Sequence, residues 1–332
     1  MNYLILSSLT APAVTGSGAA LMPDQTDSFG EALMELIGKA LGTIRPDLAE
    51  GAQVCFGILA VVLLISILKL FPGAKESTAD FVGAVGISAL LLSSSNSLVH
   101  LSVDTIRQMS QYGKLLLPVM TSALAAQGGI TSSAALYAGT ALFDMILGTV
   151  LTELLVPAVY IYLTLSTAGA AIGEEILKKL SGFVKWLSVW VLKIVLYIFT
   201  GYMGITGVVS GTTDAAALKA AKITISGAVP VVGGILSDAS EAVLVSAGIV
   251  KNAAGIYGVL AILAIFAGPF LQVGAHYLMI KITGAVCSVF GAKRCTELIT
   301  DFSSAMGLLL AMLGSVCLLQ LISTVCFLRG VG

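Results

Sequence analysis

The sequence predicts an all-α, polytopic integral membrane protein, a membrane helix bundle. Three observations predict this class. Hydrophobic residues make up 57% of the chain and charged residues only 11%, the mean hydropathy is +1.01, and long apolar runs recur along the chain. A typical soluble domain has roughly 25% charged residues, because much of its surface stays in contact with water. We therefore expect lipid to be the solvent for most of the 332 residues.

The first element expected is residues 1–28, an extended or degenerate leader-like segment. The apolar stretch from Tyr3 to Leu9 is short, no basic residue precedes it, and residues 10–30 are rich in Ala, Gly, Pro, Ser and Thr. Residues 29–50 follow as an amphipathic helix. Its apolar face consists of Phe29, Leu33, Leu36, Ile37, Leu41 and Ile44. Such a helix is typical of one that lies on the membrane or on a partner.

Residues 51–332 form a single polytopic transmembrane domain with seven or eight predicted spans, since a spanning helix needs about 20 apolar residues. The expected spans are 52–71, 81–103, 134–151, 154–172, 186–210, 225–247, 254–281 and 303–327. Little more than Glu153 and Pro157 separates the third from the fourth. The connections are too short for a separate soluble domain. With eight spans, the basic residues divide almost evenly between the two sides of the membrane, so the positive-inside rule leaves the orientation open.

A glycine-rich segment from Gly201 to Asp214 is the most informative stretch of the chain. We expect a helix to end there, with a polar side chain capping the next helix. The candidate caps are Thr212, Thr213 and Asp214. On the next helix, Lys219 and Lys222 share a face.

The segment after these lysines contains helix-breaking residues at membrane depth, namely Pro230, Gly233 and Gly234, followed by Asp238. Broken helices are tolerated there where protein or water surrounds the freed backbone groups. Three interpretations stay open: a transporter's binding site, a re-entrant element of a pore, and a packing kink. The many glycines, 36 in all, are typical of close helix packing and also fit water-lined or mobile helices.

Ionisable residues within the spans are functional candidates, because burying a charge in lipid is costly. They are His100, Asp144, Glu153, Lys193 and His276. Asp144 is the strongest candidate because apolar residues flank it on both sides. Lys193 is a suggested partner, and the role is either to hold helices together or to pass an ion or proton. His276, beside Tyr277, could hydrogen-bond a neighbouring helix.

The sequence contains no catalytic set, so we expect no enzyme, cofactor or metal. It has two histidines and no nucleophile, zinc-protease or nucleotide-binding motif. The five cysteines are scattered through apolar runs without metal-ligand spacing. The net charge is −1 and no run of Lys and Arg exceeds two residues, which argues against a nucleic-acid partner.

Three segments carry a family resemblance: LLLPVMTSALAAQGG at 115–129, GYMGITGVVSGTTDAAALKAAK at 201–222 and AVPVVGGILSDASEAVL at 228–244. They resemble the stage III sporulation protein AE family of endospore-forming bacteria, and the similarity extends over nearly the whole chain. The resemblance implies no role for any single residue.

The resemblance implies a multi-pass protein of the mother-cell membrane that surrounds the forespore. It implies a core subunit of a channel or secretion-like complex that links the two cells and supports forespore development and late forespore gene expression. The implied partners are other stage III A operon proteins, among them a secretion-type ATPase and ring-forming subunits, and a forespore membrane protein. Further copies of the chain are another candidate. The alternative from the residues is a stand-alone permease for a small solute, suggested by Asp144 and the Pro/Gly-Gly breaks.

Overall fold

The computed structural model describes residues 12–14, 16–23, 29–71, 76–228 and 233–329, with the backbone alone described over 207–228 and 233–245. Across these ranges the chain forms helices and no strand. Six of the described helices are long and apolar enough to cross a membrane. The predicted all-α polytopic class is therefore confirmed.

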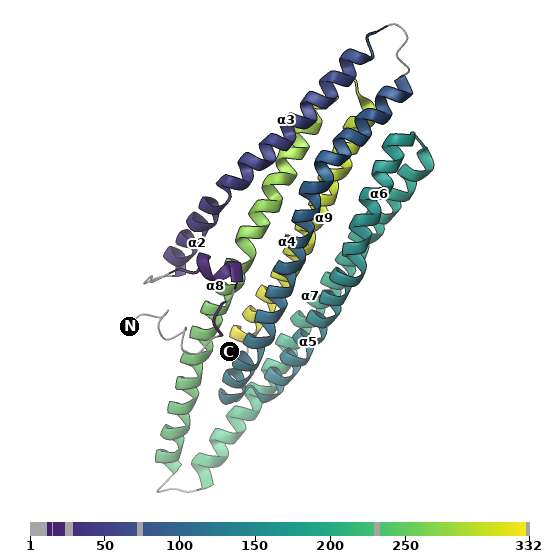
Figure 1. Ribbon diagram of the computed structural model, residues 1–332. Helices are drawn as coiled ribbons and strands as arrows, with labels where there is room; N and C mark the ends of the chain where they lie inside the picture. The colour runs from purple at the N-terminus through teal and green to yellow at the C-terminus, as the bar shows by residue number, and fades with distance from the viewer. Residues whose placement is uncertain (1–11, 15, 24–28, 72–75, 229–232, 330–332) are drawn as a thin grey trace.

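Long helices lie side by side and alternate in direction along one axis (Figure 1). The elements are η1 Gly16–Leu21, α2 Phe29–Thr43, α3 Arg45–Leu68, α4 Glu76–Ala126, α5 Ile130–Thr149, η2 Val150–Leu155, α6 Val156–Ile172, α7 Glu175–Ala228, α8 Gly233–Ser288 and α9 Lys293–Arg329. The lower ends of α7 and α8 extend beyond the rest of the bundle in Figure 1.

The described spans are fewer than the predicted seven or eight, because two of the expected spans form one helix and a third lies partly outside the described residues. The spans expected at 134–151 and 154–172 form one continuous helix, Ile130–Ile172. The span expected at 225–247 includes residues 229–232, which lie outside the described residues, and its other side chains are not described. The remaining expected spans coincide with parts of α3, α4, α7, α8 and α9.

A π-helical turn joins α5 to α6 and explains the merger. η2 is this turn, and the backbone N–H of Val156 donates to the carbonyl of Leu151, five residues back. Pro157 has no N–H, and its ring would clash with the carbonyl of Glu153 in a regular α-helix. The wider turn accommodates the proline without ending the helix. The proline that suggested a boundary between two spans therefore sits within one long helix.

The predicted helix end at residues 212–214 is wrong. α7 continues through Thr212, Thr213 and Asp214 to Ala228, so these residues cap no helix. Glycine costs about 1 kcal/mol in a helix, whereas proline costs about 3, and no proline occurs in α7. The alanines from 215 to 221 favour the helix, so the glycine-rich segment does not end it.

The N-terminal elements pack against α8. Residues 29–43 of the predicted amphipathic helix form α2, in which Leu36 and Ala40 are buried against Leu21 and Ala264, whereas residues 45–50 begin α3. Part of the segment expected to be extended forms the 3-10 helix η1 instead. Gly18 allows this contact, because a Cβ there would lie 2.7 Å from Cγ1 of Ile265.

Half of the predicted apolar face of α2 remains uncovered. Phe29, Ile37 and Leu41 are exposed, whereas Leu36 and Ile44 are buried. Apolar exposure is general on the outer helices, with Phe56 on α3 71% exposed and Leu64 67% exposed. A surface of this kind is typical of contact with lipid rather than water. The core itself centres on α9, which buries Phe302 and Phe327 completely or nearly so.

Candidate functional site: polar groups within and along the bundle

Asp144 is buried where α4, α5 and α9 meet. Its Oδ2 accepts a hydrogen bond from Ser110 Oγ on α4 at 2.6 Å, and its Oδ1 accepts one from Gln320 Nε2 on α9 at 3.0 Å. One turn away, Thr140 on α5 and Ser323 on α9 share a buried hydrogen bond of 2.5 Å. Polar side chains thus join three helices at one level of the bundle, as expected for groups that hold membrane helices together.

A pocket of about 340 Å³ opens beside Asp144, between α4 and the α5–η2 junction. Charged side chains of both signs line it: Arg107 and Lys114 from α4, Asp144 from α5 and Glu153 from η2. Because π-helical turns are rare and frequently mark functional sites, the presence of Glu153 on η2 adds weight to this pocket. The pocket thus places charged groups of both signs beside a buried carboxyl group within the bundle.

The pocket opens onto a row of exposed polar side chains along α4, which we call the polar stripe. It consists of Ser93, Asn96, Ser97, His100, Asp104, Arg107, Gln111 and Lys114, all exposed. The three- and four-residue spacing places them on one helix face. At 1.5 Å per residue the stripe is about 32 Å long, close to the roughly 30 Å thickness of a bilayer's hydrocarbon core.

Contacts with α9 fix the depth of the polar stripe in the bundle. α4 and α9 run in the same direction (Figure 1), and Gly113 lies directly against Gln320, leaving no room for a Cβ. α9 carries no charged residue from 302 to 328. Asp104 and Arg107 therefore lie level with the middle of an uncharged, buried helix.

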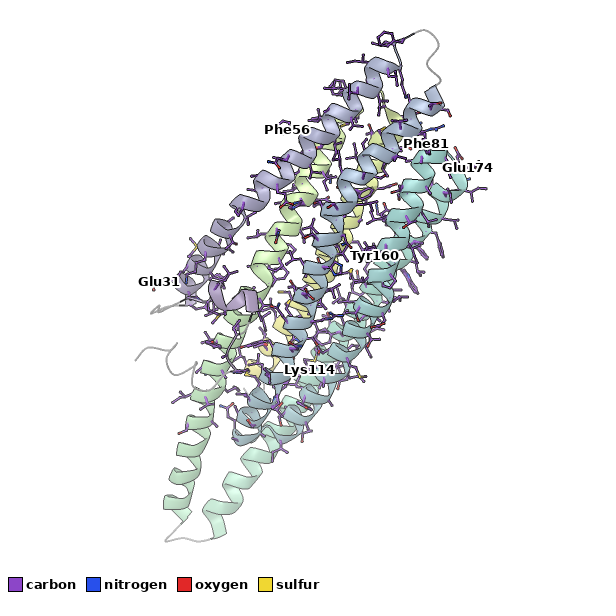
Figure 2. The ribbon with its side chains drawn as sticks, viewed as in Figure 1. Glu31, Phe56, Phe81, Lys114, Tyr160 and Glu174 are labelled. Atoms are coloured by element: carbon purple, nitrogen blue, oxygen red, sulfur yellow. The ribbon has the colours of Figure 1, made fainter. Side chains whose placement is uncertain are left out.

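Several exposed side chains on neighbouring helices near this depth are apolar, whereas Lys193 on α7 is exposed and charged. Leu142 on α5 is 50% exposed, and Ile161 on α6 is 52% exposed. Ile161 follows Tyr160, whose hydroxyl donates to Asn96 Oδ1 of the polar stripe at 2.8 Å. Figure 2 labels Tyr160 and Lys114 along this part of the bundle. An exposed charged side chain facing lipid here would cost about 2.5–3.5 kcal/mol.

The remaining described candidates are separated from Asp144. Lys193 is exposed on α7, and the suggested pairing with Asp144 is not found among the described side chains. His276 is buried, and its Nδ1 lies 3.0 Å from the carbonyl of Gln272 in its own helix. His100 belongs to the polar stripe and Glu153 to the pocket.

The other predicted site residues have no described side chains. Thr212, Thr213, Asp214, Lys219 and Lys222 lie on the backbone of α7. Pro230 lies outside the described residues, so the predicted break there is untested. Gly233 and Gly234 begin α8, and Asp238 follows them in the same helix.

Ion pairs join the helices at the end where α3 meets α4 and α8 meets α9. Asp80 on α4 pairs with Lys69 Nζ at 2.6 Å and with Arg294 Nε on α9 at 3.7 Å. Lys178 on α7 pairs with Glu297 on α9 at 2.9 Å. Because this group combines both signs around the buried Asp80, we interpret it as an ionic clamp on the bundle end.

Sequence reasoning missed the polar stripe because the second span was expected to end at residue 103. Counting polar residues at three- and four-residue spacing beyond that point would have shown that they share one helix face, although not that this face is exposed. The ion pairs at the bundle end gave no sequence signal, since Asp80 and Arg294 are 214 residues apart, the difference of their numbers. No group of three or more His, Cys, Asp or Glu side chains in the described part of the chain is arranged to hold a metal.

Comparison with known proteins gives the same family as the sequence resemblance. The family model described as "Stage III sporulation protein AE" matches residues 22–329. A Bacillus subtilis (strain 168) protein, "Stage III sporulation protein AE", is 22% identical over 290 residues, covering 86% of this chain and 69% of its own. No solved structure matches.

Proposed function

Because the chain belongs to the stage III sporulation protein AE family, we propose that it is the membrane core subunit of a sporulation-specific channel or secretion-like complex. In this proposal the complex crosses the membranes between mother cell and forespore. The chain resides in the mother-cell membrane that surrounds the forespore, and the complex supports forespore development and late forespore gene expression.

The observation that carries this proposal is a family match over 22–329 on a bundle with six candidate spans. A chain with several spans and short connections at the described turns works through its helices and through contacts with other proteins. The charged pocket and polar stripe supply hydrophilic surface at membrane depth, which a conduit needs and a purely structural anchor does not.

The proposed partners are the other stage III A operon proteins, including a secretion-type ATPase and ring-forming subunits, and a forespore membrane protein. The long helices support such contacts. α7 has 54 residues and is therefore about 81 Å long, well beyond the hydrocarbon core. Its lower part and that of α8 project past the other helices (Figure 1), where a partner can reach them.

Co-purification from sporulating cells tests this function. We expect a tagged chain to recover the ATPase and ring-forming subunits, and Asp214→Lys or Lys219→Glu to reduce that recovery at least tenfold with the chain still in the membrane. Glu174→Lys, at the opposite end of the bundle, is the matched control and should leave recovery unchanged. Loss of sporulation with full recovery of partners in both variants would contradict the assembly role.

A stand-alone permease is the second candidate, favoured by the pocket of about 340 Å³ beside Asp144. Purified chain in liposomes decides between the two. Under the conduit proposal it moves no small solute without its partners. Solute uptake by the chain alone, abolished by Asp144→Asn, would favour the permease instead.

A further inference from the structure

We propose that the polar stripe of α4 lines a water-filled path through the membrane, and that the same stripe on further copies of this chain forms its other walls. This inference rests on the proposed function and names the pore-lining surface within it. It does not follow from the family match, because a subunit that only braces a conduit would need no polar surface facing outward.

Depth is the first reason. Asp104 and Arg107 are about 64% and 65% exposed, respectively, and lie level with the uncharged middle of α9. Their ion pair is long, at 3.8 Å, so they do not neutralise one another fully. Neither side chain can reach the membrane surface from this position, because each lies several helical turns from both ends of the uncharged run. Water or protein must therefore cover them.

The second reason is the contrast with the surrounding surface. Leu142 on α5 and Ile161 on α6 lie at comparable depths and are exposed and apolar. The bundle thus exposes apolar side chains on α5 and α6 and, along α4, a continuous row of polar ones. The polar stripe runs for about 32 Å, which matches the thickness of the hydrocarbon core. A surface that is polar over the full thickness suits a continuous aqueous path better than a local hydrogen bond between helices.

The charge pattern supports further copies of this chain as the other walls of the path. The polar stripe carries Asp104 beside Arg107 and Lys114, and Asp144 and Glu153 line the adjoining pocket. Copies arranged around a symmetry axis bring identical residues to the same depth. A ring of Asp104 carboxylates then lies about one turn from a ring of Arg107 guanidinium groups, and this attraction offsets the repulsion within each ring. Arg107 of one copy then lies within one turn of Asp104 of the next. One helix face alone cannot enclose water, so several copies are required.

Cysteine labelling in membrane vesicles tests the path, using the full chain expressed without its proposed partners. The parent protein carries Cys55→Ala and Cys326→Ala, which removes the two partly exposed native thiols. The labelling that remains in this parent is subtracted from the labelling of each variant. Thiols react as thiolates, which form in water and not in lipid. A charged, membrane-impermeant thiosulfonate should modify Ser97→Cys and Gln111→Cys at least tenfold faster than the lipid-facing controls Ile161→Cys and Leu142→Cys.

Oxidative cross-linking tests the opposite wall with the same variants. We expect Ser97→Cys to form a disulfide-linked dimer of the chain, and Ile161→Cys to form none. Equal labelling rates at stripe and control positions would overturn the path. Fast labelling without any dimer at Ser97→Cys or Asp104→Cys would overturn the shared wall. A reactive stripe in a chain that recovers no partners would leave this inference standing and count against the proposed function alone.

Discussion

At the scale of single residues, the buried carboxyl group of Asp144 is satisfied by side chains from distant parts of the sequence. Asp144 receives hydrogen bonds from Ser110 and Gln320, which lie 34 and 176 residues away. Such groups are costly to bury alone, because an unsatisfied buried donor or acceptor costs about 1–3 kcal/mol. Their main expected effect is therefore to select one arrangement of α4, α5 and α9.

Asparagine and leucine at position 144 separate a structural role from a charge-dependent one. Asp144→Asn keeps an acceptor for Gln320, so we expect near-normal thermal stability in detergent. Asp144→Leu leaves Ser110 and Gln320 unpaired and should lower the free energy of unfolding by about 1–3 kcal/mol. Thermal unfolding followed by tryptophan fluorescence measures both. Full stability of Asp144→Leu would show that the hydrogen bonds contribute little.

Two glycines on α5 should respond in opposite ways to alanine. A Cβ at Gly139 would overlap the ring of Tyr202 on α7, whereas a Cβ at Gly148 meets nothing within 4 Å. We expect Gly139→Ala to destabilise the bundle by about 1–3 kcal/mol through overpacking. Gly148→Ala should be neutral or stabilising by up to about 1 kcal/mol, because alanine favours the helix. Equal unfolding temperatures for the two variants would show that α5 and α7 are not in close contact.

At the scale of elements, breaks that look like boundaries in the sequence become adjustments within long helices. Pro157 is accommodated by η2, and Pro118 and Pro269 lie inside α4 and α8. Neighbouring helices hold the chain in place on both sides of each proline, so the helix continues at the cost of a few backbone hydrogen bonds. We therefore expect substitutions of these prolines to be tolerated better than deletions near them, which would shift the register of the helix.

Deleting Thr152 from η2 should be far more damaging than replacing Pro157. The deletion rotates α6 by about 100° relative to α5, so Phe143 and Tyr162 can no longer both face the core. We expect loss of the folded protein from the membrane fraction. Pro157→Ala keeps the residue count and serves as the control, with expected yield near that of the parent. Normal yield of the deletion variant would mean that η2 does not set the register of α6.

At the scale of the whole molecule, the connections between the six candidate spans of the described residues lie at the two ends of the bundle. The C-terminal end of α3 at 69–71 and the turns at 173–174 and 289–292 lie at one end, and the turn at 127–129 lies at the other, as the alternating helix directions require. The ion pairs of Asp80 and Glu297 are at the first end. If the bundle crosses the membrane once along its axis, these ends face opposite compartments.

Labelling from one side of sealed vesicles tests this topology. Glu174→Cys and Ile130→Cys are both exposed positions at opposite ends. An impermeant maleimide added outside should modify one of them in intact vesicles and both after permeabilisation. Modification of both in intact vesicles would contradict an odd number of crossings between these two positions.

The sequence by itself determined that lipid surrounds most of this protein and which family it resembles. Its hydropathy and charge content predict a membrane bundle, and the segments at 115–129 and 201–222 carry the family resemblance. Only the tertiary structure decided that residues 130–172 form one helix, that Asp144 bonds Ser110 and Gln320, and that the polar residues of α4 face outward. Hydropathy is a sum over neighbouring residues, so the local sequence is enough to predict a membrane-spanning helix. Partner choice and exposure depend on helices that meet from distant positions, so no local pattern specifies them.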